Sequence, residues 1–229
     1  MLALLALAVL APTQRIGLAL NVPQGGGADA FIGAMRQQIR LGLDGNALSL
    51  KWDEFETQNG KPLDDGLGAA TLMGQKVLLT IATIDTVHRR LPADLATTKW
   101  DDPKMERRFD KFLETIAPKL RDNVQWVSLG NEVNLYLASH ADETAGYLKF
   151  LAHERDTLHQ LIPNMAVGVT VTDGDGIKAP ELVKTLQAGM DVVVFTFYPL
   201  NGMQVLPPTD VPQHFRFMTG IAQDRPLLL

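Results

Sequence analysis

The chain has 229 residues, of which 46% are hydrophobic and 21% are charged, a composition typical of a soluble globular protein with a substantial core. Its formal net charge of −5 argues against a nucleic-acid-binding protein, which would need a basic face to meet phosphate. The sequence has no cysteine, which excludes disulfides, thiolate nucleophiles and cysteine-ligated zinc.

The N-terminal segment MLALLALAVLA is the one membrane-type run, and it is too short to span a bilayer. Val9 and Ala11 are small residues at the −3 and −1 positions of a cleavage site before Pro12. We therefore predict a signal peptide at residues 1–11 and a secreted or periplasmic protein, although the usual basic residue ahead of the run is missing. An apolar N-terminal strand or helix is the alternative. Residues 12–229 are expected to form one domain, since no linker interrupts them.

Short runs of β-branched or apolar residues predict strands at residues 15–20, 47–52, 76–84, 124–129, 166–171, 191–197 and 226–229. Several of these runs, such as 77–81 and 192–195, are apolar without alternation. Strands that are buried on both faces have this pattern, as in a parallel sheet covered by helices.

Apolar residues at helical spacing predict helices between these strands, at residues 31–43, 105–120, 148–161 and 180–188 and from about 209 onward. The stripe over 105–120 is the clearest, with Asp101 or Asp102 as its N-cap and Pro103 near its first turn. The segment 63–74 gives a weaker signal because it carries two glycines.

Alternating strands and helices predict a parallel α/β fold. An open dinucleotide-binding fold would need a Gly-x-Gly-x-x-Gly turn after its first strand, and residues 21–27 lack that spacing. Functional-looking side chains instead end many different strands, as in a (β/α)8 TIM barrel. These side chains are Trp52, Asp53, Asp85, Asn131, Glu132, Thr172, Asp173 and Tyr198. With about seven strands predicted, we expect an incomplete barrel.

The segment WVSLGNEV, residues 126–133, ends an apolar run in Gly-Asn-Glu before an amphipathic helix. This pattern places the carboxyl group of Glu132 at the end of a buried strand, where burial can keep a carboxyl group protonated near neutral pH. Glu132 is therefore the candidate general acid/base, and a surface carboxylate at the start of a loop is the alternative. Asn131 beside it offers an amide that can donate to and accept from a substrate hydroxyl.

The pattern resembles the clan A glycoside hydrolases, which are (β/α)8 barrels that mostly use a retaining mechanism. The likeness rests on Gly-Asn-Glu at 130–132, on Phe-Tyr-Pro at 197–199, and on strand two with the residues after it, 48–56. It implies that Glu132 is the acid/base of an enzyme that cleaves O-glycosidic bonds of a polysaccharide or oligosaccharide. The expected partner is a carbohydrate, and no metal or organic cofactor is required.

The clan's nucleophile is a glutamate at the end of strand seven, which this sequence reaches at residues 225–229. Retaining hydrolysis needs two carboxyl groups about 5–5.5 Å apart. We therefore predict a chain that is truncated before its nucleophile and has no appreciable activity. A substitute from within the chain is a weaker alternative, and its candidates are Asp53, Glu54, Asp85 and Asp173.

Aromatic side chains at the predicted strand ends are candidates for sugar-binding walls, because flat ring faces suit the C–H faces of pyranoses. Trp52 and Tyr198 are these candidates, with packing at the barrel rim as the alternative for each. Trp100 is expected to anchor a surface loop. His153, Glu154 and His159 lack the spacing of a His-Glu-x-x-His zinc motif and are expected on a solvated helix face.

Two other functions are compatible with such a barrel. The first is a non-catalytic carbohydrate-binding protein that keeps the barrel and lacks the nucleophile. The second is a lyase or isomerase, for which Lys51 could in principle form a Schiff base.

Overall fold

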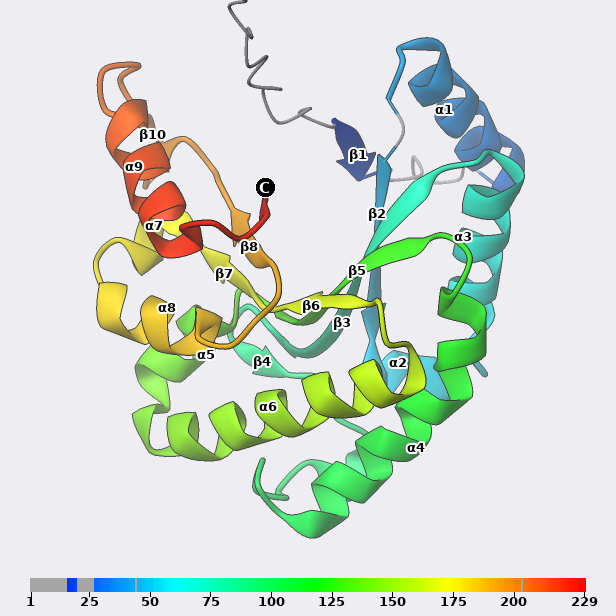
Figure 1. Ribbon diagram of the computed structural model, residues 1–229, viewed down its shortest axis with the longest axis horizontal. Coiled ribbons are helices and arrows are strands. Elements are labelled where there is room, and N and C mark those ends of the chain that lie inside the picture. Colours follow the sequence, from blue (N-terminus) through cyan, green and yellow to red (C-terminus); the bar gives the residue numbers. More distant parts are fainter. Residues whose placement is uncertain (1–15, 20–26, 44, 203) are drawn as a thin grey trace, which may run out of the picture.

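The computed structural model describes residues 16–19, 27–43, 45–202 and 204–229 (Figure 1). The signal peptide predicted at residues 1–11 lies outside these residues. Among the described helices, none combines the length and the apolar character needed to cross a bilayer.

Parallel strands form the centre of the fold and follow one another in sequence order. They are β1 (Gly17–Ala19), β2 (Gly45–Lys51), β3 (Lys76–Asp85), β5 (Val124–Asn131), β6 (Ala166–Gly168), β7 (Thr170–Thr172), β8 (Val193–Thr196) and β11 (Leu227–Leu228). One sheet has the order β1-β2-β3-β5-β6, and the other has the order β11-β8-β7. Because only Val169 separates β6 from β7, these two segments act as one curved strand that joins the sheets. The described residues therefore supply seven consecutive strands of a (β/α)8 barrel, which confirms the predicted incomplete barrel.

Helices alternate with the strands and cover the sheet (Figure 1). They are α1 (Ala28–Arg40), α2 (Trp52–Thr57), α3 (Lys61–Leu72), α4 (Pro103–Leu120), α5 (Val133–Ser139), α6 (Thr144–Leu161), α7 (Asp173–Gly176), α8 (Pro180–Gln187) and α9 (Val211–Ala222). The α4 helix begins as predicted, since the Asp102 side chain accepts a hydrogen bond from the Lys104 amide at 2.7 Å and Pro103 occupies the first turn.

Several smaller elements accompany these parallel strands and helices, and they were not predicted from the sequence. The two-residue strand β4 (His88–Arg89) pairs antiparallel with β3. A hairpin joins β9 (Leu200–Asn201) to β10 (Gln204–Val205), and short 3₁₀ turns span Ala93–Leu95 and Ala141–Glu143. These elements are too short for hydrophobic periodicity to reveal.

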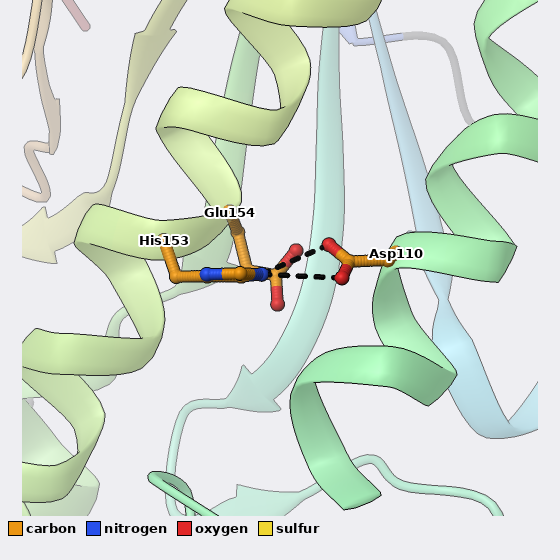
Figure 2. A group of neighbouring side chains, drawn as sticks. All are labelled: Asp110, His153 and Glu154. Carbon is orange, nitrogen blue, oxygen red and sulfur yellow. Dashed lines mark hydrogen bonds and ion pairs between the residues drawn. The ribbon is translucent and has the colours of Figure 1, made fainter. Parts of the chain in front are cut away.

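The surfaces of α4 and α6 that face each other contain a polar group that the sequence placed elsewhere. Glu154, expected on a solvated face, is buried and points from α6 toward Asp110 on α4 (Figure 2). Its neighbour His153 bonds Asp110 at 3.1 Å. The expectation of a solvated face is therefore wrong for Glu154, which lies between Leu151 and Leu158 on the apolar stripe of the helix.

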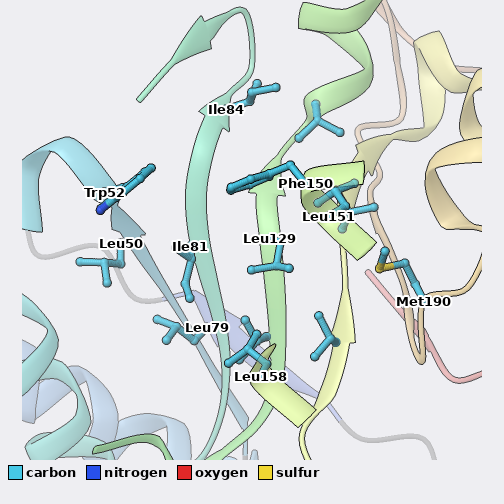
Figure 3. Packing of buried hydrophobic residues seen from close by; sticks show 14 of the residues in the cluster. Leu50, Trp52, Leu79, Ile81, Ile84, Leu129, Phe150, Leu151, Leu158 and Met190 are labelled. Carbon is cyan, nitrogen blue, oxygen red and sulfur yellow. The ribbon is translucent and has the colours of Figure 1, made fainter. Parts of the chain in front are cut away.

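The hydrophobic core lies between the strands and the helices that cover them (Figure 3). Ile81 of β3 and Leu129 of β5 are fully buried and belong to the same apolar cluster as Phe150 of α6. Aromatic side chains link the covering helices α4 and α6 edge to face, with the rings of Phe109 and Phe150 centred 5.1 Å apart. This packing fixes the strands, and so the positions of the side chains at their carboxyl ends.

Candidate active site

The carboxyl ends of the parallel strands share one edge, where barrel enzymes place their sites. The polar side chains at this edge come from the ends of β2, β3, β5, β7 and β8. They are Lys51, Asp85, Thr86, Asn131, Glu132, Thr172 and Thr196. The packed strands below hold this row in place.

Gly130 makes the sharp turn from β5 toward α5 possible. Its φ is +111°, in the region that favours glycine. A Cβ atom here would lie 2.5 Å from Val133 Cγ1 and 2.6 Å from the Tyr147 hydroxyl. That hydroxyl is fully buried and donates to the Leu129 carbonyl at 3.0 Å. The chain therefore needs a glycine immediately before Asn-Glu.

Glu132 itself adopts the left-handed conformation, with φ 52° and ψ 38°. A residue with a Cβ rarely adopts this geometry, which costs of the order of 1–3 kcal/mol. Residues strained in this way cluster at functional sites. The turn leaves Glu132 at the N-terminal end of α5, with 9% of its surface exposed.

Two threonine hydroxyls hold the carboxyl group of Glu132. Thr86, which follows β3, donates to Oε2 at 3.2 Å, and Thr196 at the end of β8 donates to Oε1 at 2.8 Å. The Thr86 amide also donates to the Asn131 carbonyl at 2.9 Å. Each oxygen thus has one donor and keeps further lone-pair capacity, so the group is oriented and can still give or take a proton.

Asn131 belongs to a polar row along the same edge. Its Nδ2 donates to Asp85 Oδ1 at 2.9 Å, and the other Asp85 oxygen lies 4.0 Å from the Lys51 ammonium. The three side chains stand on the adjacent strands β5, β3 and β2. They offer donors and acceptors for a polar substrate beside Glu132.

Trp52 does not line this edge, so its interpretation as a sugar-binding wall is wrong. The chain turns into α2 at this residue, and the fully buried indole packs against α4. Its ring lies edge-on to Phe109 at 4.8 Å and tilted to Phe112 at 6.0 Å. Strand alternation ends where the helix begins, which is why the pattern misplaced this side chain.

Tyr198 follows β8 and is 62% exposed. Its neighbour Phe197 turns the other way and packs against Phe215 of α9 at 5.4 Å. The Tyr198 ring stands two residues beyond Thr196, which binds Glu132. Because its exposed ring follows the polar edge, Tyr198 remains a candidate sugar-binding wall.

The other carboxylates that the sequence offered as substitute nucleophiles have partners of their own. Arg90 lies 3.4 Å from Asp53 and 2.6 Å from Glu54. Asp173 is fully buried and paired with His214 of α9 at 2.5 Å. Each of these carboxyl groups therefore already has a side-chain partner.

The threonines that hold Glu132 were not predicted from the sequence. The one local signal at either position is that Thr196 interrupts an apolar run. Thr86 simply follows the charged end of a predicted strand. Asn134 was not predicted either. Its side-chain amide donates to Thr172 Oγ1 at 2.9 Å and accepts from the Thr172 backbone amide at 2.8 Å, which fixes α5 against β7. Such partners become visible only when distant strands are adjacent.

No protein-family model and no curated protein matches the chain. Solved structures do match. An exo-β-1,4-mannosidase from Opitutaceae bacterium strain TAV5 is 17% identical with a TM-score of 0.74, and the match covers 94% of this chain and 45% of the mannosidase. A GH5_18 protein from Streptomyces cattleya in complex with GlcNAc is 18% identical with a TM-score of 0.64, covering 81% of this chain and 51% of that one.

The catalytic domain of a GH53 protein from Ignisphaera aggregans is another match, at 17% identity and a TM-score of 0.64. It covers 86% of this chain and 59% of that domain. The chain thus spans about half the length of the structures it matches. At this identity the likeness shows a shared fold, which is the barrel of these glycoside hydrolases.

Proposed function

We propose that this chain is the part of a retaining glycoside hydrolase that carries the proton donor. The observation that carries the proposal is the carboxyl group of Glu132, held by Thr86 and Thr196 at the carboxyl edge of the barrel. The fold likeness to glycoside hydrolases supports it. In this role Glu132 protonates the oxygen of the leaving sugar and later activates water.

Neighbouring side chains would hold the sugar. The amide of Asn131, oriented by Asp85, is placed to bind a hydroxyl near the cleaved bond. The exposed ring of Tyr198 offers a flat face to a pyranose. The substrate class we propose is a β-linked polysaccharide or oligosaccharide. A polymer of this kind is met outside the cell, which fits the export predicted from residues 1–11.

The nucleophile would be a second carboxyl group about 5–5.5 Å from Glu132. Asp53, Glu54 and Asp173 are already paired, and Asp85 accepts a hydrogen bond from Asn131 and faces Lys51. We therefore assign the nucleophile to the end of the seventh barrel strand, just past β11. The 229 residues would then supply the acid and not the nucleophile. Such a chain would bind sugar and leave the glycosidic bond intact unless another nucleophile is added.

Azide can test this assignment by taking the nucleophile's place. We expect the chain to convert a phenyl β-glycoside slowly or not at all in buffer, and to form an α-glycosyl azide when molar azide is present. Azide would attack the anomeric carbon while Glu132 gives its proton to the departing phenolate oxygen. Glu132→Gln should lower the azide-dependent rate by about 10²–10⁴-fold, the usual contribution of a general acid. Glu181→Gln is the matched control, because Glu181 is an exposed glutamate paired with Lys184.

Two results would overturn the proposal. If glycosides bind without any azide-dependent turnover, the chain is better described as a carbohydrate-binding barrel. If turnover persists in Glu132→Gln but disappears in Asp85→Asn, the acid has been assigned to the wrong carboxyl group.

A further inference from the structure

A cluster of ligand-type side chains lies between α4 and α6, on the helices that cover the sheet (Figure 2). Asp110 comes from α4, and His153 and Glu154 come from α6. One nitrogen or oxygen atom of each lies within 4.8 Å of the others. The Nε2 atom of His153 is 3.1 Å and 3.2 Å from the two carboxylate oxygens of Asp110.

Glu154 is the unusual member of this cluster. Its exposed fraction is 0%, and neither carboxyl oxygen has a hydrogen-bond partner among the described residues. Burial, together with the negative charges of Asp110 and Glu106 on α4, raises the pKa of Glu154 to about 10. A buried carboxyl group without a hydrogen-bond partner costs free energy of folding. In this fold the Glu154 carboxyl group lies beside Asp110 and His153.

The opposite side of the cluster is open to solvent. The side chains of His153 and Asp110 are 39% and 29% exposed, so a small ion has an entry path. Thr157, one turn further along α6, donates to Asp110 Oδ1 at 2.9 Å and so orients that carboxylate. Hydrogen bonds of this kind typically hold the ligands of metal sites in place.

We propose that Asp110, His153 and Glu154 bind a divalent transition-metal ion, best matched by Zn²⁺, which ties α4 to α6. One imidazole nitrogen with two carboxylate oxygens suits Zn²⁺, whereas Ca²⁺ and Mg²⁺ prefer oxygen ligands alone. Ligand atoms on a tetrahedral Zn²⁺ ion stand about 3.4 Å apart. The His153 and Asp110 atoms already have nearly this spacing. Because the three ligand atoms lie within 4.8 Å of one another, a side-chain shift of at most about 1.4 Å would bring in Glu154. Water entering from the open side would complete the coordination.

The ion would act on stability, since the cluster lies on the helical layer and not at the carboxyl edge of the strands. A cation gives the Glu154 oxygens the partner they lack, and Glu154 would release its proton on binding. An ion that binds the folded chain alone raises the melting temperature in proportion to its binding free energy. This proposal is independent of the glycosidase assignment, and neither test affects the other.

The test is a Zn²⁺ titration of the chelator-treated, full chain against a chromophoric competitor, with melting temperature as a second measurement. We expect one Zn²⁺ per chain and a higher melting temperature. His153→Ala and Asp110→Asn should each weaken binding by at least 10-fold. His159→Ala is the matched control, because His159 also lies on α6 and also faces a carboxylate, Asp191 at 2.8 Å, but belongs to no three-ligand cluster among the described residues.

A further variant separates a ligand from a structural role. Glu154→Gln should lose Zn²⁺ binding, yet in chelator it should melt at a higher temperature than the parent, because the buried acid is gone. The proposal is wrong if the parent takes up no stoichiometric Zn²⁺, if His153→Ala and His159→Ala lower the affinity equally, or if Glu154→Gln binds as tightly as the parent.

Discussion

Gly130 and Glu132, two residues apart, both carry backbone constraints of the site, as does Thr86 with its φ of 60°. Gly130 has a positive φ, and the absence of a Cβ atom leaves room for Val133 and the Tyr147 hydroxyl. Glu132 has a positive φ despite its side chain. The turn therefore sets the direction of the Glu132 carboxyl group. The contacts around this group maintain that direction despite the strained backbone.

Replacing Gly130 by alanine should destabilise the chain. The new methyl would lie 2.5 Å from Val133 Cγ1, and the φ of +111° disfavours alanine, so we expect a loss of about 2–4 kcal/mol in the free energy of unfolding. Urea denaturation followed by circular dichroism measures it. Gly174→Ala is the control, because its Cβ would meet no atom within 4 Å. Equal losses in the two variants would show that the turn is not constrained.

The raised pKa of Glu154 predicts how stability changes with pH in chelator. Its pKa is about 10 in the folded chain and near 4.5 when unfolded, so between these values the folded state holds a proton that the unfolded state releases. Stability then falls as pH rises through this window, and glutamine removes the effect.

The free energy of unfolding of Glu154→Gln should therefore exceed that of the parent by a margin that grows with pH. We expect about 2–5 kcal/mol at pH 8 and little difference at pH 4.5. Urea denaturation at pH 5, 7 and 9 measures the difference. A difference that stays constant across these pH values would show that Glu154 is already ionised in the folded chain.

At the scale of elements, the sequence predicted what depends on local periodicity. The seven predicted strands correspond to the parallel strands of the barrel, with ends displaced by a few residues and with 166–171 divided into β6 and β7. The predicted helices are present too. Apolar runs and helical stripes are local properties, and so they can be read from one segment at a time.

The errors concern side chains whose environment is set by distant segments. Trp100 was expected at the surface, but it is buried: it donates from Nε1 to Glu143 at 2.7 Å, and Arg89 lies over its ring at 4.4 Å. Trp52 was misplaced because a helix begins at this residue, where the predicted strand was expected to end. Within the site, the position of Glu132 at a strand end could be predicted from the sequence. Its partners Thr86 and Thr196 could not, because they stand 46 and 64 residues away in sequence.

At the scale of the whole molecule, the parallel strands of the described residues include two outer strands, β1 and β11. Within the described residues, β1 pairs only with β2 and β11 pairs only with β8, so each leaves one edge unpaired. The exposed apolar side chains Ile16 and Leu229 adjoin these edges. Unpaired edges beside apolar side chains favour association between chains.

We therefore expect the 229-residue chain to associate in a concentration-dependent manner. Size-exclusion chromatography with light scattering should give a mass above the 25.1 kDa of one chain. Lysine at positions 16 and 229 should shift the chain toward the monomer, because charge on an edge strand opposes pairing. A parent chain that elutes as a cooperative, concentration-independent monomer would show that the edges are covered.

The central claim is that Glu132 is a proton donor, and leaving-group dependence tests it most directly. In molar azide, we would compare the parent with Glu132→Gln on a phenyl β-glycoside and on the 2,4-dinitrophenyl glycoside of the same sugar, whose leaving group departs without a proton. The account predicts a rate loss of about 10²-fold or more on the phenyl substrate and less than about 10-fold on the activated one. Equal losses on both substrates would contradict it, because Glu132 would then be needed for something other than its proton.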